Sequence, residues 1–289
     1  MKIAILGAHG FLGQKLCPAL IAQGHEITGY VLNPEQVIAG EFEYKSVREL
    51  FTGPISGASP YDVTINLAAR RSTRNQPFTE SQVHEFTYEI PKEFILRTSN
   101  PQTIVVNAST YIQNFEGQTG QTVDSYGAAK EELSQFLEKE SGLNRFKTRD
   151  LFFFTLYGIG DRPGHLVPLL LDAAKSGGAI TLSPGHQLMN LLYINDAVQN
   201  ILECISQTPH SSYSKNYVWS DEYFSVRELV ARIESTIDLE INATWGGREY
   251  VGHEMMQPWP IPMMQLPNFA APTNLEKGIM QTWNPTEVV

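Results

Sequence analysis

Three glycines stand at intervals of three residues, directly after a short apolar run at the start of the chain. The run Lys2–Gly7 is rich in β-branched and apolar residues and predicts a strand, while Phe11–Gln23 has apolar residues at helical spacing. A glycine triplet between a strand and a helix permits a tight turn, close approach of the backbone to a pyrophosphate, and close helix packing. The pattern therefore predicts a dinucleotide-binding turn, whose candidate cofactor-binding residues are Gly7, Gly10, Phe11, Leu12 and Gly13.

Strand-like and helix-like segments alternate through the first half of the chain. Amphipathic stretches separate further apolar runs, which predict strands at Glu26–Leu32, Val63–Leu67, Ile104–Val106 and Thr148–Phe154. Such alternation is typical of a parallel sheet that is covered by helices on both faces. We therefore expect an α/β fold with a doubly wound parallel sheet of the Rossmann type and a smaller C-terminal substrate lobe.

The character of the chain changes after Gly158, where glycine and proline separate short segments, and residues 246–272 are rich in Pro, Met and Trp. The pattern indicates a loop-rich lobe that is assembled from separated pieces. We expect residues 1–157 to form the dinucleotide-binding domain, with 187–209 returning to it, and 158–186 and 210–289 to form the substrate-binding lobe.

Charge and cysteine content argue against several function classes. The chain has 289 residues and a formal net charge of −10, and it has no Lys/Arg-rich run, so nucleic acid is not an expected partner. Its two cysteines, Cys17 and Cys204, form neither a disulfide framework nor a metal-ligand spacing, so we expect a reducing cytoplasm and no metal site. No apolar run approaches the ~20 residues of a membrane span.

Tyr126 and Lys130 suggest a catalytic pair. Four residues apart on a helix, they share one face, where the ammonium can lower the pKa of the phenol and hold a cofactor ribose. The same spacing recurs at Tyr88 and Lys92, but that copy contains a proline and precedes the strand Ile104–Val106, whereas the first copy follows it. We therefore assign catalysis and cofactor binding to Tyr126 and Lys130; surface helix residues are the alternative reading of both copies.

Hydroxyl groups follow the strand Ile104–Val106 at Ser109 and Thr110. Ligands of open α/β sheets collect at the carboxyl ends of the strands. A hydroxyl there can donate a hydrogen bond to a substrate carbonyl beside the tyrosine, although Ser and Thr are also common turn residues.

The second predicted strand ends without the charged residue that usually selects the cofactor. Tyr30, Val31, Leu32 and Asn33 include no carboxylate for the ribose of NAD and no Arg for the 2′-phosphate of NADP. A carboxylate at position 31 would repel that phosphate, so its absence predicts a weak preference for NADP over NAD. Asn33 is a further candidate cofactor-binding residue.

Six short segments occur in a fixed order along the chain: GAHGFLG, INLAA, NASTYIQ, YGAAK, LYGIGD and YINDAV. In this order they resemble the motifs of extended short-chain dehydrogenases/reductases of the NAD-dependent epimerase/dehydratase family, and the resemblance covers nearly the whole chain. Two more segments, SPGHQLMNLLYIND and WGGREY, resemble the C-terminal half of nucleotide-deoxysugar 4-ketoreductases. The chain departs from the family pattern at Asn66, Ile159 and Asn195, where the family has His, Pro and Asp.

The resemblance implies roles for individual residues. Tyr126 would be the general acid, Lys130 its partner and ribose ligand, and Thr110 the hydroxyl that orients the sugar carbonyl, with Ser109 in reserve. The matching strand-end segment would contact the cofactor through Leu67, Ala68 and Ala69.

The substrate that the resemblance implies is a nucleoside-diphosphate deoxysugar whose 4-keto group is reduced by NAD(P)H. Because the net charge is −10, local guanidinium groups must hold the diphosphate, and Arg248 in WGGREY and Arg162 are the candidates. Trp245 or Tyr250 can face the base. The candidate substrate-binding residues are Ser109, Tyr111, Arg162, Ser183, Gln187, Arg248 and Tyr250. A homodimer is also expected, and light scattering measures it.

Two alternative functions stay open. Dehydratases of the family place Asp-Glu after the catalytic Thr, where this chain has Tyr111 and Ile112, so dehydration is disfavoured. A nucleotide-sugar epimerase with tightly bound NAD needs only to remove and return a hydride. A non-catalytic NAD(P)-sensing Rossmann protein is the alternative from another class, although it need not keep the hydroxyl, Tyr and Lys together.

Overall fold

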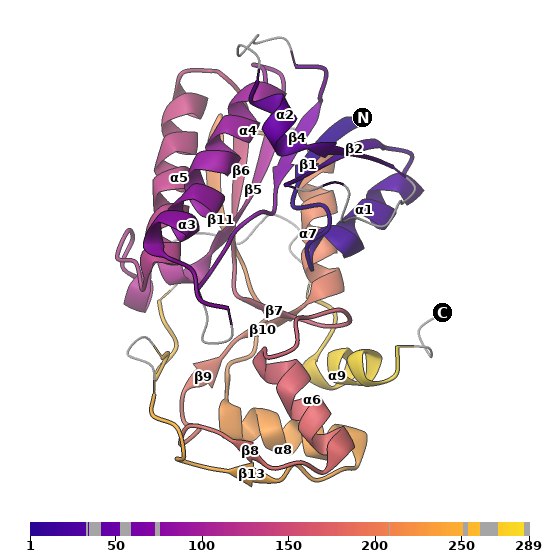
Figure 1. Ribbon diagram of the computed structural model, residues 1–289, viewed down its shortest axis with the longest axis vertical. Helices are drawn as coiled ribbons and strands as arrows, with labels where there is room; N and C mark the ends of the chain where they lie inside the picture. Colours follow the sequence, from indigo (N-terminus) through magenta and orange to yellow (C-terminus); the bar gives the residue numbers. More distant parts are fainter. Residues whose placement is uncertain are drawn as a thin grey trace. The chain divides into compact units, whose positions relative to one another are not determined.

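The structure is a computed structural model (Figure 1), and it describes residues 1–32, 34, 42–52, 59–72, 76–207, 209–250, 254–260 and 271–285. The chain forms two compact units. One holds Met1–Phe153 and Val198–Val218, and the other holds Phe154–Ala197 and, within the described residues, the chain from Trp219 onward.

The first unit is built on a seven-stranded sheet with the order β11-β6-β5-β4-β1-β2-β3, in which every pairing is parallel. Strands β2 and β3 follow β1 on one side, and β4, β5, β6 and β11 follow on the other. The topological switch point of the sheet therefore lies between β1 and β4. The predicted doubly wound α/β fold is confirmed. The strands are β1 (Lys2–Leu6), β2 (Glu26–Val31), β3 (Glu43–Ser46), β4 (Val63–Asn66), β5 (Ile104–Thr110), β6 (Lys147–Phe153) and β11 (Tyr213–Val218).

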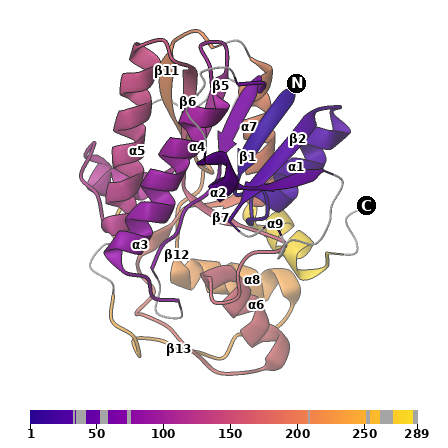
Figure 2. The same ribbon diagram turned by 45° about the horizontal axis from the view of Figure 1, so that its top comes forward.

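Helices lie on both faces of this sheet. Helices α4 (Ile90–Thr98) and α5 (Ser125–Gly142) lie along one face, and α1 (Gly13–Ala22) lies on the other, as Figures 1 and 2 show. Helix α7 (Ile194–Ser206) begins in the second unit and ends in the first. The shorter elements are α2 (Val47–Leu50), α3 (Glu80–His84), the π-helical turn η2 (Glu85–Glu89) and the 3₁₀ turns η3 (Tyr111–Gln113) and η4 (Phe115–Gly117).

The core of the first unit joins the sheet to α4 and α5. Leu6 on β1 and Val105 on β5 pack in one buried cluster with Phe94 of α4 and Leu133 of α5. Burial of a large apolar side chain contributes about 1.5–3 kcal/mol to stability. This packing fixes α5 against the strands whose carboxyl ends carry the candidate site.

Two boundaries differ from the sequence analysis. Strand β5 continues through Thr110, because its pairing with β6 extends to the end of that strand, so Asn107–Thr110 is strand and not loop. Strand β11 pairs with β6 in the sheet, although the residues after 209 were assigned to the smaller lobe. Its sequence YSKNYV is too polar to show the apolar alternation of a strand.

The described residues of the second unit form three two-stranded ladders and three helices besides the start of α7. Helix α8 starts after Ser225, whose hydroxyl accepts a hydrogen bond from the Glu228 N–H in a capping box. The ladders pair β7 (Thr155–Tyr157) with β10 (Leu191–Tyr193), β9 (Leu188–Met189) with β12 (Phe224–Ser225), and β8 (Ile180–Thr181) with β13 (Ala243–Thr244). The helices are α6 (Leu166–Ser176), α8 (Val226–Ile237) and α9 (Leu275–Trp283).

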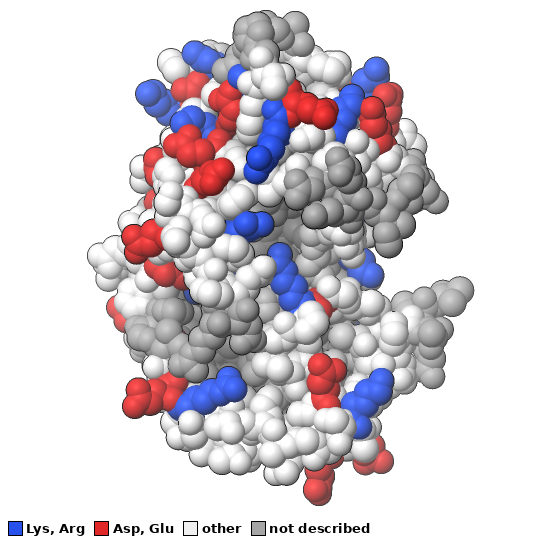
Figure 3. Space-filling view, viewed as in Figure 1, with Lys and Arg blue, Asp and Glu red and all other residues white. Residues whose placement is uncertain are grey.

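No helix in the described part of the chain has both the length and the apolar character needed to cross a membrane. In the same part, no three His, Cys, Asp or Glu side chains group as possible ligands of a metal ion. On the face shown in Figure 3, basic and acidic side chains are interspersed, and they do not form one broad basic patch.

Candidate active site

The glycine turn brings the start of α1 close to the end of β4. Gly7 has a φ of +85°, a conformation that favours glycine. A Cβ at Gly7 would lie 3.0 Å from the backbone nitrogen of Ala68, and a Cβ at Gly13 would overlap the carbonyl oxygens of Gly7 and Ala8. Only glycine therefore permits this approach of backbone to backbone.

The first turn of α1 fits the pyrophosphate that the glycine pattern predicts. Leu12 is the N-cap residue and supplies no side-chain acceptor to the helix. The Gln14 N–H donates to the Gly10 carbonyl oxygen at 2.9 Å and the Lys15 N–H to that of Leu12 at 3.2 Å. The positive end of the helix dipole, more than these two N–H groups, can therefore attract a phosphate oxygen. The neighbouring Phe11 is half-buried. Asn33, which was predicted to bind the cofactor from the end of the second strand, lies outside the described residues.

Tyr126 and Lys130 lie one turn apart on α5. Asp124 is the N-cap of this helix, and its carboxylate accepts a hydrogen bond from the Gly127 N–H at 2.8 Å. The cap fixes where the first helical turn begins, and the four-residue spacing places Tyr126 and Lys130 on one face. Tyr126 is half-buried, whereas Lys130 is only 1 % exposed.

Two backbone carbonyl groups hold the ammonium of Lys130. Its Nζ donates to the carbonyl oxygen of Ala108 at 2.5 Å and lies 3.4 Å from that of Ala68. Ala108 belongs to β5 and Ala68 follows β4, so the lysine bridges the carboxyl ends of two neighbouring strands. The predicted cofactor-binding segment 67–69 is thereby brought beside the predicted catalytic lysine.

Burial changes the acidity of this lysine. Removal from water lowers the pKa of Lys130 from 10.5 to about 8, and the negative charge of Asp150 opposes this shift. The residue can therefore lose its proton closer to neutral pH than an exposed lysine does.

A pH-dependent contribution to stability should follow. Below about pH 8 both the folded and the unfolded state keep the Lys130 proton; between about pH 8 and 10.5 only the unfolded state does. Because the unfolded state binds the Lys130 proton in this window and the folded state does not, the contribution of this residue to the free energy of unfolding should rise with pH there. We expect Lys130→Met to lack this rise, as measured by urea unfolding at several pH values across the window.

The exposed Lys139, on the same helix, gives the matched control for this prediction. Lys139→Met should keep the pH dependence of the parent protein. Identical pH dependence in the parent and in Lys130→Met would show that the buried ammonium does not titrate in this window.

The sequence analysis missed a second cation beside Tyr126. Arg71, which follows β4, forms an ion pair with the N-cap residue Asp124 at 2.8 Å. Its guanidinium carbon lies 5.8 Å from the centre of the Tyr126 ring. A positive charge there favours negative charge on the phenol oxygen. Two consecutive arginines after INLAA were the available signal, but no spacing rule connects position 71 with the start of α5.

The two hydroxyl candidates at the end of β5 differ in their surroundings. The Ser109 hydroxyl donates to Asp150 Oδ1 at 2.6 Å inside the protein, and this bond argues against its reserve role as the group that orients a substrate. Thr110 is the last residue of the strand and is 9 % exposed. Successive strand residues point to opposite faces, so Thr110 does not share the direction of Ser109. Tyr111, the first residue of η3, is half-buried.

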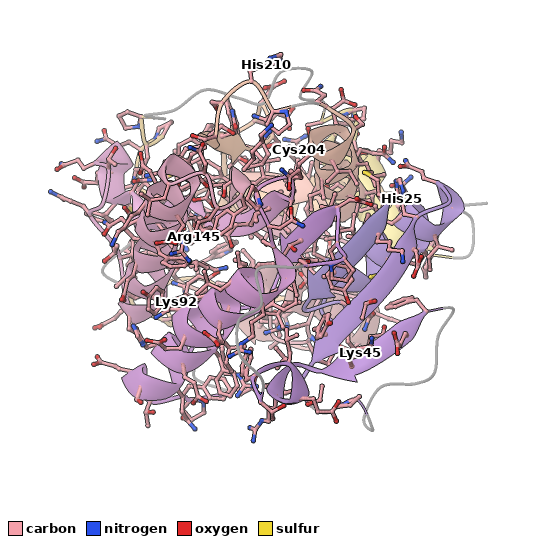
Figure 4. The ribbon with its side chains drawn as sticks, turned by 90° about the horizontal axis from the view of Figure 1, so that it is seen from above. His25, Lys45, Lys92, Arg145, Cys204 and His210 are labelled. Atoms are coloured by element: carbon pink, nitrogen blue, oxygen red, sulfur yellow. The ribbon has the colours of Figure 1, made fainter. Side chains whose placement is uncertain are left out.

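The second Tyr–Lys pair has different surroundings. Tyr88 lies in η2 and Lys92 in α4, where Lys92 Nζ forms an ion pair with Glu89 at 3.1 Å. The same ammonium lies 4.8 Å from the centre of the Tyr88 ring. Figure 4 shows Lys92 on the helical layer outside the sheet. Both residues are half-buried, and Tyr88 packs against the apolar cluster of the first unit. The Lys92 ammonium is thus paired with a carboxylate close by in the chain, and not with carbonyl groups at strand ends.

Three candidate substrate-binding residues come together in the second unit. Gln187 is buried and its side-chain amide donates to the Ser183 hydroxyl oxygen at 2.8 Å. The Tyr250 phenol oxygen accepts a hydrogen bond from the His186 N–H at 3.2 Å. Residues 183–187 are therefore joined to the end of the WGGREY segment.

The two predicted arginines of this unit are exposed. The Arg248 N–H donates to the carbonyl oxygen of Leu182 at 3.2 Å, which fixes its backbone beside β8. Arg162 lies between β7 and α6, and its N–H donates to Asp161 Oδ1 at 2.7 Å. Both guanidinium groups can reach solvent-borne anions.

Trp245 has a partner that the sequence analysis missed. The guanidinium carbon of Arg227 lies 4.4 Å from the centre of the tryptophan ring, and Arg227 Nε donates to the carbonyl oxygen of Pro184 at 2.7 Å. Gly185 passes against this pair, because a Cβ there would overlap the Trp245 ring. One face of Trp245 is therefore covered by a cation, and that face does not stack on a base. No spacing in the sequence links position 227, at the start of α8, with position 245.

Comparison with protein families identifies the chain. The model of the NAD dependent epimerase/dehydratase family matches residues 3–217. The chain belongs to this family. The expected resemblance is confirmed, and the protein is an enzyme of the short-chain dehydrogenase/reductase type, as predicted.

Individual proteins are similar to this one over most of the chain. CDP-abequose synthase of Yersinia pseudotuberculosis is 28 % identical over 267 residues, which cover 89 % of this chain and 92 % of that protein. Among solved structures, MoeE5 in complex with UDP-glucose and NAD has a TM-score of 0.81 at 17 % identity, with 100 % of both chains covered. The UDP-glucuronic acid 4-epimerase of Bacillus cereus has a TM-score of 0.80 at 16 % identity, with 98 % of both chains covered. These structural similarities establish the shared fold.

Proposed function

We propose that this family member is an NAD(P)H-dependent oxidoreductase that reduces the 4-keto group of a nucleoside-diphosphate deoxysugar. The observation that carries the proposal is the placement of Tyr126 and Lys130 on one face of α5, with the lysine bound at the ends of β4 and β5. The similarity to CDP-abequose synthase supports a deoxysugar as the substrate.

A bound nicotinamide dinucleotide would supply the hydride. The glycine turn would hold its pyrophosphate, residues 67–69 would lie beside it, and Lys130 would bind its ribose. As negative charge develops on the sugar ketone oxygen, Tyr126 donates a proton to that oxygen. The Lys130 ammonium stabilises the phenolate that remains, and the Thr110 hydroxyl orients the ketone by a hydrogen bond.

The preference for NADP over NAD is also a proposal. Val31 and Leu32 are the described residues at the end of β2, and neither would repel a 2′-phosphate. The edge strand β3 places Lys45 opposite Tyr30, where it forms an ion pair with Glu43 at 3.0 Å (Figure 4). Because Lys45 is already paired with a carboxylate, the discrimination is expected to be small.

The experiment that tests the proposed function is turnover of nucleoside-diphosphate 4-keto deoxysugars with NADPH and with NADH. Net oxidation of the cofactor and formation of the 4-hydroxy sugar would support the reductase. Mass spectrometry of small molecules that co-purify with the protein gives a parallel readout. Dinucleotide binding without turnover of any keto sugar would instead favour the NAD(P)-sensing alternative.

A nucleotide-sugar epimerase with tightly bound NAD is the second candidate. Tyr111 and Ile112 follow Thr110, so the carboxylate pair expected of a dehydratase does not follow the threonine, whereas epimerisation needs no such pair. The shared fold with the Bacillus cereus 4-epimerase is compatible with this reaction. Retained NAD, together with interconversion of 4-epimers without net cofactor consumption, would select the epimerase.

The exposed Arg248 gives a test of the substrate class. We expect Arg248→Ala to weaken binding of a nucleoside-diphosphate sugar by roughly 1.5–3 kcal/mol, the range for a hydrogen bond to a charged group. Dinucleotide affinity should stay unchanged, and isothermal titration calorimetry measures both ligands. Arg145→Ala is the control, because Arg145 is exposed in the first unit and paired with Glu140. Equal losses for both ligands, or no loss for the sugar nucleotide, would reject the assignment of Arg248.

A further inference from the structure

A row of buried polar side chains crosses three adjacent strands of the sheet. Asn66 on β4, Asn107 on β5 and Asp150 on β6 are paired in register, and all three are 0 % exposed. Paired residues on neighbouring strands point to the same face of a sheet, so the three side chains lie in line. Interior strands of parallel sheets are normally apolar on both faces. The row is therefore a departure that requires a physical explanation.

The Asp150 carboxylate is bound on both oxygens. Its Oδ1 accepts hydrogen bonds from Asn107 Nδ2 at 2.8 Å and from the Ser109 hydroxyl at 2.6 Å. Its Oδ2 accepts a hydrogen bond from the Tyr213 hydroxyl at 3.0 Å. A buried carboxylate is strongly destabilising unless such donors or a positive charge compensate for the lost water. Donors from two strands, β5 and β11, thus hold one negative charge of β6 in the interior.

Through Asn66, the row of buried polar side chains is connected to Ala68, whose carbonyl group is one of the two that hold Lys130. Asn66 Nδ2 donates to Asn107 Oδ1 at 2.7 Å, and Asn66 Oδ1 accepts a hydrogen bond from the Ala68 N–H at 3.1 Å. The carbonyl group of the same Ala68 faces the Lys130 ammonium. Asn66 stands where the family pattern has His, and here it connects the row to the lysine.

The row is also connected to Ala108, whose carbonyl group is the other one that holds Lys130. Ala108 accepts the shorter hydrogen bond from Lys130, and it lies between Asn107 and Ser109 on β5. Both of these neighbours donate to Asp150. The backbone on either side of the Ala108 carbonyl is therefore attached to the same carboxylate.

Other ionisable groups around the row come from α5 and β11. Lys130 is buried in α5, and Asp150 opposes the lowering of its pKa by burial. Glu138 of α5 is paired with Lys215 of β11 at 3.5 Å, and Glu131 of α5 accepts a hydrogen bond from Gln113 at 3.1 Å. Burial and the negative charge of Asp150 both raise the pKa of Tyr213, so it stays a neutral donor. The carboxylate and the lysine are thus opposite charges within one buried network.

We propose that Asp150 is a positioning residue for Lys130: it fixes the two carbonyl groups that hold the ammonium, through Asn107 and Asn66, and its charge stabilises that ammonium. The inference rests on the proposed function, because Lys130 is a catalytic and cofactor-binding residue only there. It adds a residue on β6 that contacts neither the substrate nor the cofactor.

The charge of Asp150 is tested with Asp150→Asn, which keeps the shape of the side chain. The measurement is the affinity of the full chain for NADPH and NADH by fluorescence titration at several pH values, without a sugar substrate. The affinity of the parent should fall as Lys130 loses its proton near pH 8. In Asp150→Asn this fall should move about one pH unit lower, the scale of a unit charge several ångströms away.

The matched control is Thr148→Val on the same strand. Thr148 is also 0 % exposed, but its hydroxyl is bonded to Ser141 at 2.8 Å and not to the row. The control should therefore keep the pH dependence of the parent, even if it loses stability. A parent-like pH dependence in Asp150→Asn would overturn the proposal.

Asn66→Ala tests the mechanical connection while the carboxylate stays in place. Loss of the bond to the Ala68 N–H should weaken dinucleotide binding about threefold to tenfold, the range for one hydrogen bond, without moving its pH dependence. A dinucleotide affinity of Asn66→Ala equal to that of the parent would also overturn the proposal. This variant tests the proposal if Asp150→Asn does not fold. Both readouts are independent of the sugar. If no keto sugar reacts, the proposed function is rejected. The link between Asp150 and Lys130 is then tested by dinucleotide binding alone.

Discussion

Tyr126→Phe should lower kcat about 10²–10⁴-fold, the usual contribution of a positioned proton donor, while the protein stays folded. The phenyl ring keeps the contacts of the half-buried aromatic side chain, and only the hydroxyl is lost. The Lys130 ammonium remains bound to the strand ends, so dinucleotide affinity should change little. Steady-state kinetics with a keto-sugar nucleotide, together with a dinucleotide titration, measures both quantities.

The chain itself offers the control for this variant. Tyr88 has the same four-residue spacing to a lysine, but Lys92 is paired with Glu89 on the outer helical layer. Tyr88→Phe should therefore keep nearly full kcat. A Tyr126→Phe protein with nearly full kcat would remove Tyr126 from the mechanism, whatever the result for Tyr88.

Gly13→Ala should reduce dinucleotide affinity about 10- to 10²-fold, the range for the loss of one hydrogen bond to a charged group. The added Cβ would overlap the carbonyl oxygens of Gly7 and Ala8, which are backbone atoms and cannot rotate away. The start of α1 must therefore shift, and the positive end of its dipole moves away from the proposed position of the pyrophosphate. Overpacking of this kind also costs about 1–3 kcal/mol of stability.

Gly142→Ala is the matched control. Gly142 is the last residue of α5, and a Cβ there would meet nothing within 4 Å. This substitution should leave dinucleotide affinity unchanged and raise the free energy of unfolding by about 0.5–1 kcal/mol, because alanine loses less entropy in a helix. Gly13→Ala with parent affinity for both dinucleotides would contradict the role of the glycine turn.

Local features of the sequence predicted the architecture. The glycine triplet after Lys2–Gly7, the alternation of apolar and amphipathic segments, and the bounds of the helix Val226–Ile237 all depend on neighbours within a few residues. The pairing of Tyr126 with Lys130 was also predictable, because helical periodicity alone places them on one face. Strand β11 was not predicted as part of the sheet, because its sequence YSKNYV lacks the apolar pattern of a strand. Its place in the sheet follows from its pairing with β6.

The sequence by itself thus determined the fold class, the glycine turn after β1 and the placement of Tyr126 and Lys130 on one helix face. Only the tertiary structure decided which groups surround that pair. Asp150 is 43 positions from Asn107 and Arg71 is 53 positions from Asp124, and strand order and helix packing bring each pair together. Periodicity reports which face a residue occupies, but it does not report which strand lies beside it. The environment of Lys130 is therefore a property of the assembled sheet, because it depends on the register of β4, β5 and β6.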